Sequence, residues 1–119
     1  MKRNQREIGS RYEEKAAAYL AEQGLTVIER NYRRCTGEID VIAKEGPCLV
    51  FCEVKYRKDS RKGFPEEAVS IRKQRVISQC AAYYLMEKGY TAVPCRFDVI
   101  SIMGDEMHLV RNAFDYVGR

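Results

Sequence analysis

Hydrophobic and polar residues alternate with two different periods along the chain, and these periods predict two helices and five strands. Residues 7–23 and 65–88 carry hydrophobic side chains at three- and four-residue steps, and a glycine follows each segment. Strand-like alternation occurs in residues 25–29, 37–43, 49–57, 95–102 and 107–110. The order helix, three strands, helix, two strands predicts an α/β fold in which a mixed sheet is flanked by helices.

The helical spacing also identifies the side chains expected to face the core. In the first helix these are Ile8, Tyr12, Ala16, Tyr19 and Leu20. The second helix is expected to begin at Pro65, because proline suits a first turn and the acids that follow suit the positive end of the helix dipole. Its buried stripe is expected to comprise Ala68, Val69, Val76, Ile77, Cys80, Ala81, Tyr84 and Leu85. The last segment, residues 107–110, is expected to be a short edge strand.

The second and third strands predict a hairpin with like charges opposite one another. If Lys44 pairs with Leu49, then Asp40 lies opposite Glu53, and Lys55 follows on the same face. Two opposed carboxylates repel each other, more so beside an apolar surface. The pattern therefore predicts a positive group between them, either a divalent cation or Lys55 itself.

The first of these alternatives has a chemical meaning. Asp40, Glu53 and the carbonyl of Val54 are hard oxygen ligands suited to Mg²⁺ or Mn²⁺, and Lys55 can orient or deprotonate a water beside them. Such a site is suited to phosphodiester hydrolysis. Glu13 reaches it if the first helix packs over the sheet, although Glu14 competes for that role and a solvated position is the plainer expectation for either. In the other alternative the three charges form a surface ion-pair cluster, and spacing alone favours neither.

Composition narrows the class of protein. The 119 residues suit a single domain over residues 1–119, and 45% hydrophobic with 32% charged residues suits a globular chain. No run of roughly 18 apolar residues predicts a membrane span, and the basic N-terminus lacks the apolar segment of a secretory signal, so we expect a cytoplasmic location. Five cysteines without zinc-ligand spacing and a single histidine argue for reduced thiols rather than a structural zinc site.

The net charge of +4 indicates only a mild preference for anionic partners, but the cations are concentrated around the predicted hairpin. A basic, glycine-containing loop over residues 58–64 suits either a phosphate backbone or plain solvent. The cations proposed to contact nucleic acid are Arg33, Arg34, Arg57, Lys58, Arg61, Lys62 and Lys73.

Several motifs together resemble a known family. They are Gly9, Glu13 and Ala16 in the first helix, RNYR over residues 30–33, GEIDVI over 37–42, LVFCEVKYR over 49–57 and RFDV over 96–99. In this order, over nearly the whole chain, they look like the YraN-type UPF0102 bacterial family. That family is similar to the PD-(D/E)xK nucleases and to Holliday-junction resolvases, and the resemblance implies a restriction-endonuclease-like fold.

The resemblance also implies roles for individual residues. It implies metal ligands at Asp40 and Glu53, the motif lysine at Lys55 and an accessory acid at Glu13, which joins the expected metal ligands. Gln74, next to Lys73 on the second helix, matches a family position and is expected to support the site. Cys52 stands where the family often has valine, and its side chain is expected to point away from the acids.

Two classes of function follow from these residues. The first is a Mg²⁺- or Mn²⁺-dependent endonuclease acting on DNA, with branched or structured DNA as the resolvase-like substrate; a homodimer would fit a two-fold symmetric junction. The second is a non-catalytic nucleic-acid-binding or adaptor protein on the same fold, with steeply salt-dependent binding and no turnover. A third alternative is an interaction module in which the acids and Lys55 are only structural.

Overall fold

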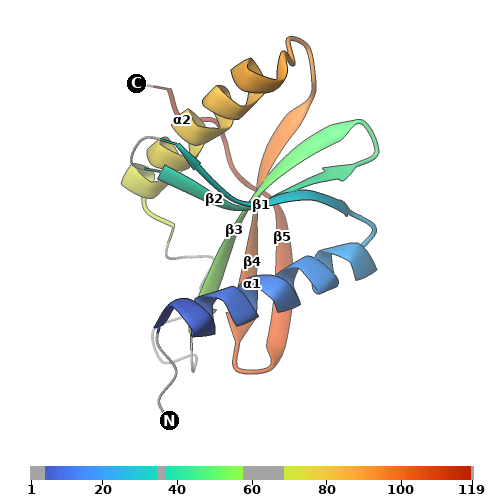
Figure 1. Ribbon diagram of the computed structural model, residues 1–119, viewed down its shortest axis with the longest axis vertical. Helices are drawn as coiled ribbons and strands as arrows, with labels where there is room; N and C mark the ends of the chain where they lie inside the picture. Colours follow the sequence, from blue (N-terminus) through green and yellow to red (C-terminus); the bar gives the residue numbers. More distant parts are fainter. Residues whose placement is uncertain (1–4, 35–36, 58–68, 119) are drawn as a thin grey trace.

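The computed structural model describes residues 5–34, 37–57 and 69–118, with side chains described from residue 11 onward and not for Arg57 (Figure 1). Predictions for the side chains of Ile8 and Arg57, and for Lys58, Arg61, Lys62 and residues 65–68, lie outside the described residues. The elements are α1 (Gln5–Glu22), β1 (Thr26–Arg34), β2 (Gly37–Glu45), β3 (Cys48–Arg57), α2 (Ile71–Lys88), β4 (Cys95–Met103) and β5 (Glu106–Phe114). The predicted order of helices and strands is confirmed.

The five strands form one mixed sheet in the order β1-β2-β3-β4-β5. Neighbouring strands are antiparallel except β3 and β4, which run parallel. This parallel pair needs a long connection, and α2 lies within it. The prediction of a mixed α/β sheet is confirmed, and β5 is at one edge as expected.

The helices cover opposite faces of the sheet, so the core has two layers (Figure 1). Strand alternation sends odd-numbered residues of β3 toward α2 and even-numbered residues toward α1, as Phe51 and Cys52 illustrate. The buried residues on the α2 side are Tyr32, Ile39, Ile42, Leu49, Phe51, Ile77, Cys80, Ala81, Tyr84 and Phe97. Those on the α1 side are Ala16, Leu20, Leu25, Val41, Ala43, Val50, Cys52, Ile100 and Ile102.

The second helix begins later than the sequence predicts. It starts at Ile71 rather than Pro65, and Val69 precedes it outside the helix. Ser70 is the reason: its backbone is extended, and its hydroxyl accepts a hydrogen bond from the backbone N–H of Lys73 at 3.1 Å. Serine satisfies an N-terminal N–H in this way more effectively than a proline several residues upstream. The predicted burial of Ile77, Cys80, Ala81 and Tyr84 is confirmed.

Both edge strands are longer than predicted. The polar residues 30–34 continue β1 past a bulge between Val27 and Glu29, with Asn31 at a φ of 54°. Strand β5 extends to Phe114, whose ring stacks on that of Phe97 with the ring centroids 5.0 Å apart. The hydrophobic pattern of a polar strand does not show such a contact with a distant residue, so the strand ends could not be predicted from it. No helix within the described residues has the length and apolar character needed to cross a membrane.

Candidate active site

The predicted hairpin register is correct near the turn and fails at the acids. Lys44 pairs with Leu49 as expected, but the β2–β3 pairing continues only to Val41 and Cys52. The predicted cross-strand pair of Asp40 and Glu53 is therefore not formed within this ladder. In its place the Val54 backbone N–H donates a hydrogen bond to Asp40 Oδ2 at 2.8 Å, so a side chain replaces the next rung of the ladder.

A kink in β2 explains why the strands part. Ile39 and Ile42 both pack on the α2 side, although residues three apart lie on opposite faces of a regular strand. Across from this kink, Asn31 of β1 has a left-handed backbone with a φ of 54°. Asp40 lies at this irregularity, where its carboxylate turns toward β3. Figure 1 shows β2 and β3 diverging here, β2 toward α2 and β3 toward the opposite end of the molecule.

Glu53 is the most buried acid at the point where β2 and β3 part, which we call the gap; 5% of its surface is exposed. Its Oε1 atom lies 3.6 Å from Lys55 Nζ and 3.7 Å from Lys73 Nζ. Because Phe51, two residues earlier, packs on the α2 side, Glu53 faces the same way and meets a lysine from α2. Burial raises the pKa of Glu53, and the two ammonium groups oppose that rise.

Asp40 is electrostatically the most strained group of the site. Burial, together with the charge of Glu53, raises the pKa of Asp40 to about 7, while the hydrogen bond from the Val54 N–H opposes the rise. An aspartate with such a pKa needs a cation nearby in order to be fully ionised at neutral pH. The pKa of Glu13 is raised as well, first by burial and then by the charge of Glu38.

On the side of Asp40 away from Glu53, its carboxylate lies close to two further acids, Glu13 and Glu38. One oxygen from each of Glu13, Glu38 and Asp40 lies within 4.8 Å of the others, and we call these residues the acid cluster. The Asn31 side-chain amide lies between two of them; with its nitrogen facing the acids it donates to Glu13 and, at 3.0 Å, to Glu38. Helix α1 thus brings Glu13 to Asp40 as predicted, while its competitor Glu14 is exposed.

Glu38 is the residue that the sequence analysis missed. Its place two residues before Asp40 on the same strand was the available signal, because alternation places such residues on one face. Glu38 is also engaged by Arg33, whose Nε lies 3.5 Å from Glu38 Oε2.

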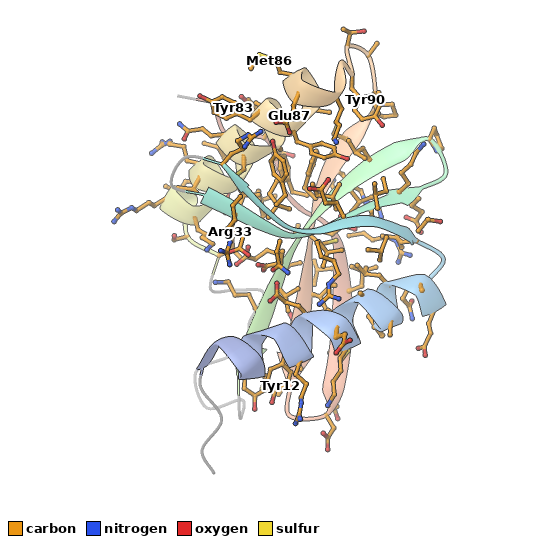
Figure 2. All side chains as sticks on the ribbon, in the orientation of Figure 1. Tyr12, Arg33, Tyr83, Met86, Glu87 and Tyr90 are labelled. Atoms are coloured by element: carbon orange, nitrogen blue, oxygen red, sulfur yellow. The ribbon has the colours of Figure 1, made fainter. Side chains whose placement is uncertain are left out.

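Those predicted nucleic-acid contacts whose side chains the structure describes separate into two groups. Arg33, with 66% of its side chain exposed, and Lys73 lie beside the acids. Arg34 instead forms an ion pair with Glu87 of α2 and lies over the ring of Tyr32. Glu87, labelled in Figure 2, lies in the last turn of α2, whereas Lys73 lies in the first turn, so this ion pair holds Arg34 near the end of α2 away from Lys73.

Gln74 has a different contact from the one expected. Its Nε2 donates to the Val69 carbonyl at 3.1 Å and so holds the segment that enters α2. Among the described hydrogen bonds it has none to Asp40 or Glu53. A supporting role for Gln74 in the site stays a prediction.

A pair of stacked tyrosines fixes α1 over β3. The rings of Tyr12 and Tyr56 are 4.0 Å apart at 23°. Each is the chain neighbour of a site residue, Glu13 on α1 and Lys55 on β3. Tyr12 is labelled on the first helix in Figure 2. Cys52 is buried on the α1 side, away from Glu53, as expected.

A cavity of about 700 Å³ lies elsewhere, along the C-terminal half of α2. Its lining includes Leu85, Tyr90, Phe97, Phe114 and Tyr116, but none of the acids described above. It therefore has no part in the candidate active site.

Comparison with known proteins identifies the family. A family model described as "Uncharacterised protein family UPF0102" matches residues 12–102. The chain belongs to the UPF0102 family. The UPF0102 match includes Glu13, Asp40, Glu53, Lys55 and Lys73, and so spans the whole site.

Individual UPF0102 relatives are similar over nearly their full length. A UPF0102 protein of Lachnoclostridium phytofermentans is 49% identical, over 97% of this chain and 98% of the relative. One of Pseudoalteromonas translucida is 46% identical over 93% of each, and one of Desulforapulum autotrophicum is 43% identical over 96% and 98%. The resemblance inferred from the motifs is confirmed at the level of the family.

Proposed function

We propose that this UPF0102 protein is a metal-dependent endonuclease of restriction-endonuclease-like architecture that hydrolyses DNA phosphodiester bonds. The observation that carries the proposal is the arrangement of acids where two strands part. The Val54 N–H holds the Asp40 carboxylate against β3, beside Glu53, whose charge acts on Asp40, and Lys55 follows on the same strand. Branched or structured DNA is the proposed substrate, and a homodimer would match the two-fold symmetry of a four-way junction.

The donor set fits a divalent cation. Hard oxygens are available on two sides of Asp40: Glu13 and Glu38 of the acid cluster on one side, and Glu53 with the Val54 carbonyl on β3 on the other. The raised pKa of Asp40 agrees with this fit, because it reflects buried negative charge that a cation would compensate. Mg²⁺ or Mn²⁺ bound here would supply positive charge to the phosphoryl oxygens and acidify water.

The remaining roles belong to the cations of the chain. Lys55, with 28% of its side chain exposed, is positioned to orient the attacking water and, as an ammonium group, to stabilise the negative charge of the transition state. Arg33 is exposed beside the acid cluster and suits a phosphate of the bound strand. Lys58, Arg61 and Lys62 are proposed as further phosphate contacts.

Cleavage of several DNA structures by the purified protein tests the proposal. Duplex, forked, four-way and single-stranded DNA are incubated with Mg²⁺ or Mn²⁺, beside the variants Asp40→Ala and Asp105→Ala. Asp105, exposed in the β4–β5 turn, is the matched control. We expect Asp40→Ala to lower the cleavage rate by roughly a hundredfold or more and the control to leave it unchanged. Equal cleavage by wild type and Asp40→Ala, or no cleavage of any substrate, contradicts the proposal.

One outcome would favour the adaptor function instead. It is DNA binding that weakens steeply with salt, survives Asp40→Ala and is accompanied by no cleavage. The positive charges around the site support binding in either case, so turnover is the measurement that distinguishes the two functions.

A further inference from the structure

Glu53 has more positive charge around it than a single carboxylate requires. Both Lys55 Nζ and Lys73 Nζ approach the same oxygen, Oε1, at 3.6 and 3.7 Å. A buried carboxylate needs a counter-ion, but one ammonium group supplies a full charge. The second ammonium group is therefore surplus to neutralisation of Glu53 alone.

The two lysines are held differently. Lys55 lies two residues from Glu53 on the same strand, and 28% of its side chain is exposed. Lys73 comes from the first turn of α2, where its backbone N–H is bound to the Ser70 hydroxyl at 3.1 Å, and 44% of its side chain is exposed. Its backbone is thus fixed, while its long side chain reaches the gap from a separate element and borders solvent. Lys73 is the more exposed of the two and so has the more open path away from Glu53 into solvent.

A divalent cation and Lys73 compete for the same carboxylate. A cation shared by Asp40 and Glu53 would lie close to both ammonium groups and be repelled by them. Withdrawal of Lys73 removes one of these repulsions and leaves its ammonium group at the mouth of the site, where a phosphate of bound nucleic acid would meet it.

We propose that Lys73 is an exchangeable counter-ion of Glu53, which holds this carboxylate in the metal-free protein, gives way to a divalent cation and then binds a phosphate. This inference rests on the proposed function, since it presumes the metal site of Asp40 and Glu53. It makes Lys73 a positioning residue whose contact with nucleic acid depends on the metal.

Metal binding without DNA gives the first test. Mn²⁺ binding to the full chain is measured by electron paramagnetic resonance for wild type, Lys73→Met, Lys73→Arg and Arg72→Met. Arg72 is exposed in the same turn and is the matched control. We expect Lys73→Met to bind Mn²⁺ roughly three- to tenfold more tightly than wild type, while Lys73→Arg and the control bind no more tightly. Thermal unfolding checks that Lys73→Met is folded. If it is not, Lys73→Gln, which is also uncharged at this position, takes its place.

DNA binding gives the second test. The slope of log affinity against log salt is measured once with Ca²⁺ and once with a chelator. With Ca²⁺, we expect Lys73→Met to lower this slope by about one unit relative to wild type. With the chelator the slopes should coincide, because Lys73 then remains on Glu53. Equal lowering of the slope in both conditions overturns the exchange and makes Lys73 an ordinary phosphate contact.

The outcomes separate this inference from the proposed function. If wild type binds Mn²⁺ and Asp40→Asn does not, but Lys73→Met binds with unchanged or weaker affinity, the exchange is overturned and the metal site stands. If Lys73→Met alone binds Mn²⁺ measurably, the exchange is supported directly. If no variant binds Mn²⁺, both the metal site and the exchange are overturned.

Discussion

At the scale of single residues, the site is defined by acids whose burial works against their own charge. Asp40 is the clearest case, because burial and Glu53 raise its pKa to about 7 from 3.8. Between these two pH values the Asp40 carboxyl keeps its proton in the folded protein but has released it in the unfolded chain. Function and stability therefore conflict at this position, and the conflict is measurable without any substrate.

The conflict predicts a pH-dependent gain in stability for Asp40→Asn in the metal-free protein. Between about pH 4 and 7 the folded state binds more protons at Asp40 than the unfolded state, so wild-type stability falls as pH rises through this window. Asparagine keeps an acceptor for the Val54 N–H and has no charge to bury. We expect its advantage in the free energy of unfolding to grow by about 1–3 kcal/mol from pH 5 to pH 8.

Urea denaturation at several pH values measures this advantage, with Asp105→Asn as the exposed control. A difference between Asp40→Asn and wild type that stays constant from pH 5 to pH 8 would mean that the Asp40 carboxyl is not strained by its surroundings.

The sequence predicts those site residues that are placed by local structure better than those placed by contacts between distant segments. Asp40, Glu53 and Lys55 follow from the alternation of one hairpin, a local property, although its predicted register holds only as far as Val41 and Cys52. Alternation offered a local signal that links Glu38 to Asp40, but the approach of Glu38 to Glu13 depends on the packing of α1, which is not local. The contact of Lys73 with Glu53 required knowing where α2 begins, and Ser70 rather than Pro65 decides that.

At the scale of elements, the site depends on how closely β2 approaches α2. Gly37 begins β2, three residues before Asp40, and a Cβ atom there would lie 2.8 Å from Val76 Cγ1 and 3.0 Å from Cys80 Sγ. Both contacts are closer than atoms in a packed core tolerate. The glycine thus allows the strand and the helix to approach each other three residues before Asp40.

Replacing this glycine predicts a loss that a second substitution relieves. We expect Gly37→Ala to lower the free energy of unfolding by about 1–3 kcal/mol through overpacking. In Gly37→Ala/Val76→Ala the clashing methyl group is absent, so the double variant should lose less than the sum of the single variants. Urea denaturation of all four proteins gives the coupling energy. Strictly additive losses would show that Val76 is not the contact that excludes a side chain at Gly37.

The sequence predicts the order of the helices and strands well, but it does not predict where the edge strands end or which strands pair in parallel. Helical and strand periods give all seven elements in order, since each buries one face against the core. The ends of β1 and β5 are longer than their hydrophobic patterns, because ladder pairing and the Phe97–Phe114 stack extend them across polar residues. The parallel pairing of β3 with β4 is likewise a long-range contact.

At the scale of the whole molecule, an ion network joins the sheet at a distance from the proposed chemistry. Arg96 donates to the fully buried Asp98 from Nε at 2.9 Å and from Nη2 at 3.0 Å, and to Glu45 at 2.6 Å. Arg111 of β5 donates to the same Glu45 and, at 3.2 Å, to the Gln23 carbonyl at the end of α1. The network therefore ties together α1, β2, β4 and β5.

Asp98 is acidic, buried and part of a family-like motif, so a structural role must be distinguished from a catalytic one. Its Oδ1 also accepts the backbone N–H of Asn112 at 2.9 Å, the position where β5 adopts a φ of 54°. Every contact described for this carboxylate is thus to β4 or β5, not to the acid cluster. Removal of Asp98 would leave the Arg96 guanidinium half-buried with only Glu45 as its partner.

This assignment predicts that Asp98→Ala loses stability while retaining metal affinity. Breaking a buried ion pair costs about 3–5 kcal/mol in the free energy of unfolding. Glu45→Gln, at the half-buried end of the network, should cost less, because solvent partly screens that pair and glutamine keeps an acceptor oxygen. Urea denaturation measures both losses. At a temperature well below unfolding, Asp98→Ala should bind Mn²⁺ within about twofold of wild type, since no described contact links Asp98 to Asp40 or Glu53. If Mn²⁺ affinity falls by more than tenfold while the variant remains folded, Asp98 belongs to the active site, and β4 contributes to metal binding as well as to stability.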